Sequence, residues 1–186
     1  TPLVVPEWLL DVLLGYGDPA AAAYWSLPKE EQVTEYDFFD TFLDVSHVRD
    51  AFPHAAVKVA DGADAAAPPP YRLTIPTDLP PVYRAGDGGG DAPNPEVVVT
   101  PYSALTAGPY PEDAPKMNPI RFTPMQVESL RSAMSKGLTV VVGPPGTGKT
   151  DTAVQAVSNI AHTFPKQRTL VITHSNTALN DVFEKL

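Results

Sequence analysis

The stretch GLTVVVGPPGTGKTD, residues 137–151, decides the fold of the second half of this chain. Between Gly143 and Thr150 it has the spacing Gly-x4-Gly-Lys-Thr, the Walker A spacing of phosphate-binding loops. Residues 138–142 before it are all β-favouring, as expected for a strand buried on both faces of a parallel sheet. The residues after it have helical spacing, so the sequence predicts strand, loop and helix in the order that such a loop requires.

Each residue type in this loop has a chemical reason to be there. Gly146 and Gly148 permit backbone angles that turn successive amide hydrogens inward, toward an anion at the start of the following helix. Lys149 is predicted to reach the β- and γ-phosphates of a nucleoside triphosphate, and the Thr150 hydroxyl to coordinate Mg²⁺, so these two are the catalytic candidates. The predicted nucleotide-binding residues of the loop are Gly143, Pro144, Pro145, Gly146, Thr147, Gly148, Lys149, Thr150 and Asp151.

The composition excludes several classes of protein and site. No stretch approaches the ~20 apolar residues that cross a bilayer, so no membrane segment is predicted. The chain has no cysteine, which excludes disulfides and thiolate metal sites, and its four histidines do not have metal-ligand spacing. The net charge of −9 is unusual for a nucleic-acid-binding domain.

Residues 116–186 are predicted to alternate as helix, strand, loop, helix, strand and helix, which makes a right-handed βαβ unit of an α/β core. Thr123 is the expected N-cap of the first helix, the second strand is expected at Thr169–Thr173, and the last helix from about Asn176. Two strands alone leave apolar faces uncovered, so we expect this core to be incompletely formed. The residues expected to be buried on the three helices are Val127, Leu130, Ala133 and Met134, then Ala153, Ala156, Val157 and Ile160, then Leu179, Val182, Phe183 and Leu186.

The first 115 residues are predicted to form two regions. Residues 1–60 are expected to be a mixed α+β accessory region, with short helices up to Leu14, near Trp25, and from a Ser46 cap to Phe52. Residues 61–115 are rich in proline and glycine and are expected to be a linker with short strands at Tyr71–Ile75 and Glu96–Thr100. We interpret these strands as edges of an accessory β element; the alternative is a disordered connector with a few extended residues.

Three motifs together suggest a family. They are Phe122-Thr-x-x-Gln126, the loop with its flanks, and QRTLVITHSN at residues 167–176. Together they resemble the superfamily 1 helicases related to the nonsense-mediated-decay helicase. The loop alone does not distinguish these from AAA+ ATPases, which share GPPGTGKT. The resemblance implies an incomplete RecA-like P-loop NTPase core, the start of a first lobe, preceded by the mixed accessory region with its linker.

The resemblance also implies roles for residues outside the loop. In these helicases a glutamine at the position of Gln126 reads adenine, which would make the nucleotide ATP. Thr123-x-x-Gln126 is also a capping box, and the sequence leaves both roles open. The family places a turn equivalent to Thr173, His174, Ser175 and Asn176 against the nucleic-acid backbone, although Ser175 or Asn176 would also cap the last helix.

The upstream part of the chain resembles a member of this family that acts in pre-mRNA splicing. The expected function is therefore that of an ATP-dependent, intron-binding RNA helicase in the nucleus, with ATP and Mg²⁺ as cofactors and RNA and spliceosomal proteins as partners. The family's Asp-Glu motif, arginine finger and second lobe would follow residue 186, so the chain itself is expected to be hydrolytically inactive. The alternatives are an AAA+-type ATPase fragment and a non-enzymatic nucleotide-binding scaffold.

Overall fold

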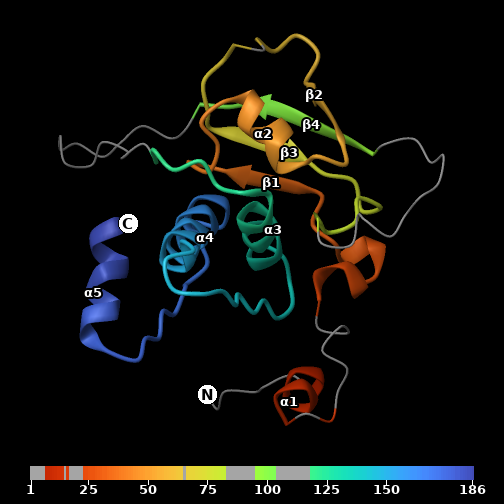
Figure 1. The fold of residues 1–186 in the computed structure, drawn as a ribbon. Coiled ribbons are helices and arrows are strands. Elements are labelled where there is room, and N and C mark those ends of the chain that lie inside the picture. Colours follow the sequence, from red (N-terminus) through yellow and green to blue (C-terminus); the bar gives the residue numbers. More distant parts are fainter. Residues whose placement is uncertain (1–6, 15, 17–22, 65, 83–94, 104–117) are drawn as a thin grey trace.

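The computed structural model describes residues 7–14, 16, 23–64, 66–82, 95–103 and 118–186 (Figure 1). Most of the alanine-rich helix predicted before Trp25 lies outside these residues, and only the short 3-10 helix at its end is described. The elements in chain order are α1 (Glu7–Leu14), η2 (Tyr24–Ser26), η3 (Lys29–Glu31), β1 (Glu35–Phe38), α2 (Val45–Ala51), β2 (Ala56–Val59), β3 (Tyr71–Thr74), β4 (Glu96–Pro101), α3 (Pro124–Ala133), α4 (Lys149–Thr163) and α5 (Asn176–Lys185). None of the described helices is long and apolar enough to cross a membrane.

The four strands form one mixed sheet in the order β1-β3-β4-β2. β3 is antiparallel to both of its neighbours, and β2 runs parallel to β4. Leu73 on β3 pairs with Tyr36 on β1 and with Val99 on β4, so three buried side chains lie in one row across the sheet. Such a row of large apolar side chains fixes the register, because a slip by one residue would expose it.

The two predicted strands at 71–75 and 96–100 are present as β3 and β4, but they are the central strands of the sheet and not its edges. The edges are β1 and β2, which precede residue 60. One sheet therefore joins residues on both sides of that position. The apolar alternation within each strand indicates which residues are buried, whereas the order of pairing depends on contacts distant in sequence that no local pattern records.

α2 begins two residues earlier than a Ser46 cap would place it. Its N-cap is Asp44, whose carboxylate accepts hydrogen bonds from the His47 amide at 2.7 Å and the Ser46 hydroxyl at 2.6 Å. These bonds lower the pKa of Asp44, and they hold the carboxylate in its charged form at the positive end of the helix. Aspartate and serine are both good caps, so composition alone did not separate them.

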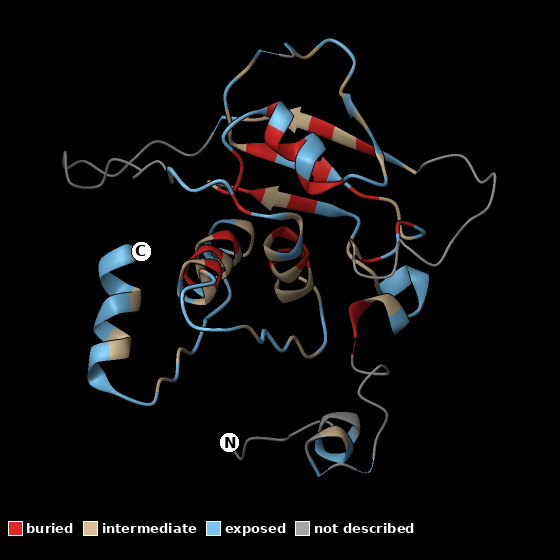
Figure 2. Ribbon diagram, viewed as in Figure 1, coloured by how far each residue is buried: buried red, intermediate tan, exposed pale blue. Residues whose placement is uncertain are grey.

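The core of the molecule lies between the sheet, α2 and α3. Buried side chains of the sheet, among them Phe38, Leu73 and Val97, pack in one cluster with Val127 and Leu130 of α3. In Figure 2 buried residues lie on the strands, on α2 and on the sides of α3 and α4 that face β1. Thr123 caps α3 and Pro124 is its first residue, as predicted. The four-stranded sheet β1-β3-β4-β2, called the accessory sheet from here on, therefore shares one hydrophobic core with α3.

The predicted buried strands at Leu138–Val142 and Thr169–Thr173 are absent as strands. Both segments lack regular secondary structure, within the described residues neither pairs with a strand, and Val142 and Leu170 are 89% and 83% exposed. The predicted βαβ unit is thus not formed. A parallel strand is stabilised by neighbours on both edges and by helices on both faces, and β-propensity alone does not replace them.

The buried faces of the last two helices also differ from the prediction. α4 buries Thr152, Val154, Gln155 and Asn159, while Ala153 is exposed and Ala156, Val157 and Ile160 are half-buried. α5 begins at Asn176 as predicted but has no buried residue, and Phe183 is 60% exposed. α4 packs against α3 and β1, and the main contact of α5 among the described elements is with α4.

Candidate nucleotide-binding site

The predicted phosphate-binding loop is folded into a tight turn at the start of α4. Gly146 and Gly148 both have positive φ, at 79° and 73°, a region that side chains with a Cβ rarely adopt. The Lys149 ammonium group donates hydrogen bonds to the carbonyls of Gly143 at 2.8 Å and Pro144 at 2.7 Å. Lys149 thus lies along the concave side of the loop, where a phosphate group would replace these carbonyls as its partner.

The loop ends at the N-terminus of a helix of 15 residues, where free amides and the helix dipole favour an anion. Thr150, in the first turn, is exposed, so its hydroxyl is accessible to a cation held by a nucleotide. Asp151 beside it accepts a hydrogen bond from Lys185 of α5 at 2.5 Å. Among the described residues no group of three or more histidines or carboxylates could hold a metal ion. The loop fits a triphosphate with its magnesium ion.

Gln126 connects α3 to this loop. Its carbonyl oxygen accepts a hydrogen bond from the Thr123 amide at 2.8 Å, and the Thr123 hydroxyl accepts one from the Gln126 amide, so the capping box is present. Its side-chain nitrogen donates to the Thr147 carbonyl at 3.2 Å. A Cβ at Gly148 would lie 2.6 Å from this nitrogen and would push the glutamine side chain aside, and the φ of 73° is the stronger reason for glycine there. Adenine recognition by Gln126 stays a prediction.

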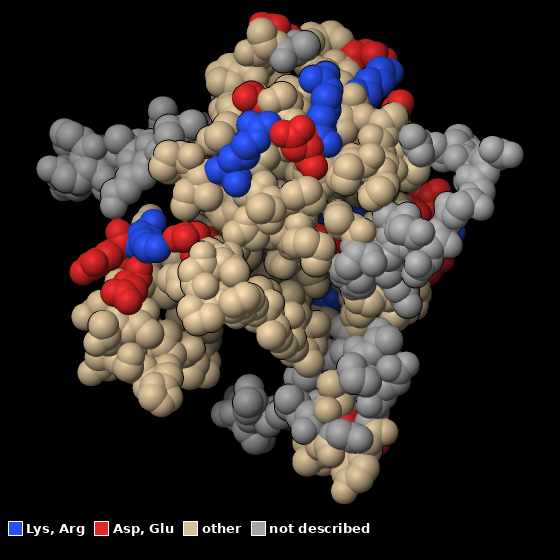
Figure 3. Space-filling view, in the orientation of Figure 1, with Lys and Arg blue, Asp and Glu red and all other residues tan. Residues whose placement is uncertain are grey.

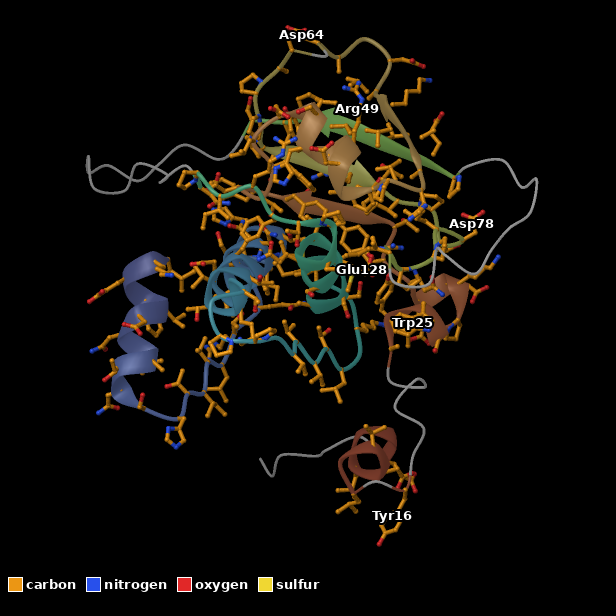
Figure 4. The ribbon with its side chains drawn as sticks, viewed as in Figure 1. Tyr16, Trp25, Arg49, Asp64, Asp78 and Glu128 are labelled. Carbon is orange, nitrogen blue, oxygen red and sulfur yellow. The ribbon has the colours of Figure 1, made fainter. Side chains whose placement is uncertain are left out.

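A cavity of about 730 Å³ extends from this loop along one side of α3. One wall is the segment 138–142, and the loop end of the cavity is lined by Gly143, Thr147 and Lys149. At its other end lie Glu128 of α3 and Trp25 of η2, which Figure 4 shows on the same side of α3. The volume is in the range of small-molecule sites. Sequence reasoning missed Trp25 and Glu128, because no local pattern brings η2 to α3.

The predicted nucleic-acid-binding turn lies at one end of α5. Ser175 caps this helix, since its hydroxyl accepts a hydrogen bond from the Ala178 amide at 3.2 Å. The Thr173 hydroxyl donates to the Ser175 carbonyl at 2.9 Å, and His174 and Asn176 are exposed. The opposite end of α5 carries Lys185, which contacts Asp151 next to the loop. Helix capping is confirmed, and contact with nucleic acid stays a prediction.

On the face of the described residues that Figure 3 shows, the basic side chains do not form one broad patch. In Figure 3 most lysine and arginine side chains lie next to aspartate or glutamate on the visible face. Arg72 pairs with Asp37, with a shortest distance of 2.5 Å, and Lys58 pairs with Asp61 at 3.2 Å. Any contact of these described residues with a phosphate backbone would therefore depend on hydroxyls and helix-start amides more than on a patch of cations.

Two family models match consecutive parts of the chain, and the first of them includes the Pro-rich passage. Residues 31–114 match the intron-binding protein aquarius insert domain, and residues 121–186 match a AAA domain. Over its whole length the chain is 48% identical to the mouse protein named RNA helicase aquarius. This chain is related to aquarius. It spans 13% of the length of mouse aquarius.

Two further relatives of the aquarius-like chain are also named helicases. The ATP-dependent helicase upf1 of Schizosaccharomyces pombe is 35% identical over 41% of this chain, which spans 9% of that protein. The DNA polymerase alpha-associated DNA helicase A of Saccharomyces cerevisiae is 33% identical over 33% of this chain and is likewise covered over 9% of its length. Of these three relatives, the mouse protein alone has a matched region long enough to include both the accessory sheet and the loop.

Gly148→Ala is expected to weaken the binding of a fluorescent ATP analogue by about five- to thirty-fold, since a left-handed alanine costs roughly 1–2 kcal/mol. The added Cβ would also displace the Gln126 amide from the loop. Gly62→Ala is the matched control, because Gly62 has a φ of 81° but lies outside the loop with nothing within 4 Å of a Cβ. Equal affinity of the Gly148→Ala chain and the unaltered chain, measured by titration, would argue against phosphate binding at this loop.

Proposed function

We propose that this chain carries the ATP-binding loop of an ATP-dependent RNA helicase that acts on introns during pre-mRNA splicing in the nucleus. One observation supports this most strongly. A complete phosphate-binding loop, Gly143–Thr150, begins α4 in a chain that is 48% identical over its whole length to a protein named RNA helicase aquarius. The neighbouring Gln126 contacts the same loop, as an adenine-reading residue of that site would.

The residues have the following proposed roles. Lys149 and the loop amides hold the β- and γ-phosphates, Thr150 holds the Mg²⁺ that accompanies them, and Gln126 binds adenine. ATP supplies the phosphoanhydride whose cleavage drives a helicase. We further propose that residues 138–142 and 169–173 become strands of a RecA-like first lobe once further strands pair with them. The exposure of both segments supports this proposal, because an apolar stretch of chain is rarely left uncovered.

The chain of residues 1–186 is proposed to bind ATP without hydrolysing it. Hydrolysis in this family requires an acidic pair that holds Mg²⁺ and positions water, and an arginine that stabilises the transition state. We propose that the turn Thr173–Asn176 contacts the RNA backbone in the complete helicase, with spliceosomal proteins as further partners. RNA is favoured over DNA because mouse aquarius, which alone among the three relatives covers the accessory sheet, is named for RNA.

The test is made on the purified chain with Mg²⁺ and single-stranded RNA or DNA of one sequence. We expect saturable ATP binding, no release of phosphate above background, and stronger retention of RNA than of DNA. Phosphate release that disappears in Lys149→Ala would contradict the proposed inactivity. Equal retention of both nucleic acids would remove the support for an RNA substrate, and no ATP binding at all would contradict the proposed role of the loop.

A further inference from the structure

The β1–α2 connection, defined here as residues 39–44 together with the first residues of α2 up to His47, reaches both helices that border the phosphate-binding loop. It contacts α4, the helix that follows the loop. It also contacts Phe122, which precedes the N-cap of α3, and Gln126 of α3 donates a hydrogen bond to the loop. None of its residues lines the cavity at the loop. The connection therefore lies behind the site and cannot touch a nucleotide there itself.

On the α4 side the contact is a buried group of polar side chains centred on Asn159. Its carbonyl oxygen accepts hydrogen bonds from the Phe39 amide at 3.3 Å and from Gln155 at 3.1 Å. Its side-chain nitrogen donates to the Thr41 hydroxyl at 2.9 Å. Asn159 and Thr41 are both fully buried, so water does not compete for these bonds. Every polar atom of the Asn159 side chain thus holds α4 against the accessory region.

The same face of α4 leads back to the loop. Thr152, Gln155 and Asn159 lie three and four residues apart and therefore share one side of the helix. All three are buried, and the Thr152 hydroxyl donates to the Gly148 carbonyl at 2.9 Å. Gly148 is the N-cap of α4 and the last glycine of the loop. A shift of α4 relative to the accessory region would accordingly move the loop.

On the α3 side the contact is made by His47. Its Nδ1 accepts a hydrogen bond from the Leu43 amide at 3.2 Å, which leaves the proton on Nε2 to donate to the Phe122 carbonyl at 2.8 Å. Burial lowers the pKa of His47 and favours this neutral form. Phe122 immediately precedes the cap Thr123, so the start of α3, and with it Gln126, is also fixed from the β1–α2 connection.

We propose that Asn159 is a positioning residue for nucleotide binding and that the accessory sheet, through Asn159, Thr41 and His47, sets the geometry of the phosphate-binding loop. This inference rests on the proposed function, because it requires that the loop binds a nucleotide. The accessory region then has a part in ATP affinity without contributing a residue to the site. Two helices held from one connection keep the loop amides and Lys149 at a fixed spacing, which is what a preorganised anion site requires.

The test compares Asn159→Leu with the unaltered chain by titration with a fluorescent ATP analogue, at a temperature where both are fully folded. We expect the dissociation constant to rise about fivefold or more, in the range of typical coupling between distant sites. Asn180→Leu is the matched control, since Asn180 is exposed on α5 and should leave the affinity unchanged. A purely structural role would lower the melting temperature without changing the affinity of the folded chain.

Thr41→Val is the second variant, because it removes one hydrogen bond to Asn159 with almost no change of shape and folds even if Asn159→Leu does not. A smaller rise in the dissociation constant, in the same direction, supports the proposal. Unchanged affinity in folded Asn159→Leu or Thr41→Val overturns it. If the unaltered chain binds no nucleotide, the proposed function itself fails, so the two failures are distinguishable.

Discussion

Lys149→Ala is expected to weaken the binding of ATP with Mg²⁺ to this chain by about two orders of magnitude or more. Hydrogen bonds to charged groups contribute about 1.5–3 kcal/mol each, and Lys149 would make two of them to phosphate oxygens. The truncation therefore removes roughly 3 kcal/mol or more, which corresponds to at least a hundredfold in the dissociation constant. Isothermal titration with a non-hydrolysable ATP analogue measures this directly.

Lys166→Ala is the matched control for this substitution. Lys166 is exposed in the turn after α4, so the control removes one lysine charge at a position outside the loop. Its affinity for the analogue should equal that of the unaltered chain. The melting temperature of Lys149→Ala without nucleotide should change little, since the lysine is bonded only to carbonyls of a partly exposed loop. Tight binding by Lys149→Ala would place the nucleotide elsewhere.

Glu128→Leu is expected to destabilise the chain by about 3–5 kcal/mol, because it leaves a buried arginine without its counter-charge. Glu128 and Arg131 are both buried, and their closest atoms are 3.8 Å apart. Glu128 also accepts a hydrogen bond from the Tyr24 hydroxyl at 2.5 Å, and burial raises the pKa of Tyr24 so that this hydroxyl stays protonated. The arginine would keep only weak bonds to the Leu79 carbonyl and the face of the Tyr24 ring. Urea unfolding followed by circular dichroism measures the loss.

The double variant Glu128→Leu with Arg131→Met should recover most of this loss, because buried ion pairs are often replaced by apolar side chains at little cost. The pair here is incompletely bonded, since the second Glu128 oxygen and the Arg131 Nε have no hydrogen-bond partner among the described residues. Glu31→Leu is the control, as Glu31 pairs with Lys136 at the surface and should cost at most about 1 kcal/mol. A double variant as unstable as the single one would show that the charges do not act as a pair.

The sequence predicted the local features of the site well, because they depend on residues close together. The cap at Thr123, the proline after it, the start of α4 directly after the glycines and the cap at Ser175 are all present. Each depends on a backbone hydrogen bond or a backbone angle within a few residues. The capping role of Gln126 was likewise readable from its spacing to Thr123.

What the sequence did not reveal depends on distant contacts. Nothing near Leu138–Val142 indicates that this run is left unpaired, and nothing near Tyr71 indicates that β3 is central in a mixed sheet. The polar face of α4 was a readable signal, because Thr152, Gln155 and Asn159 recur at helical spacing. The prediction of buried residues on this helix rested on its apolar face instead. The partner of this polar face is Thr41, which is 118 residues away from Asn159 in the sequence. No local sequence pattern connects the two residues.

The shared core described above bears on how this chain can be divided. The two family models meet between residues 114 and 121, and this looks like a natural place to separate the accessory part from the loop. Yet α3 packs against the sheet in one hydrophobic core, through Val127, Leu130 and Met134. A piece that began at residue 121 would expose these apolar side chains to water. A chimaera that exchanged the insert of one relative for that of another would need matching substitutions on α3. The two parts that the family models match separately are therefore a single unit for packing and for design.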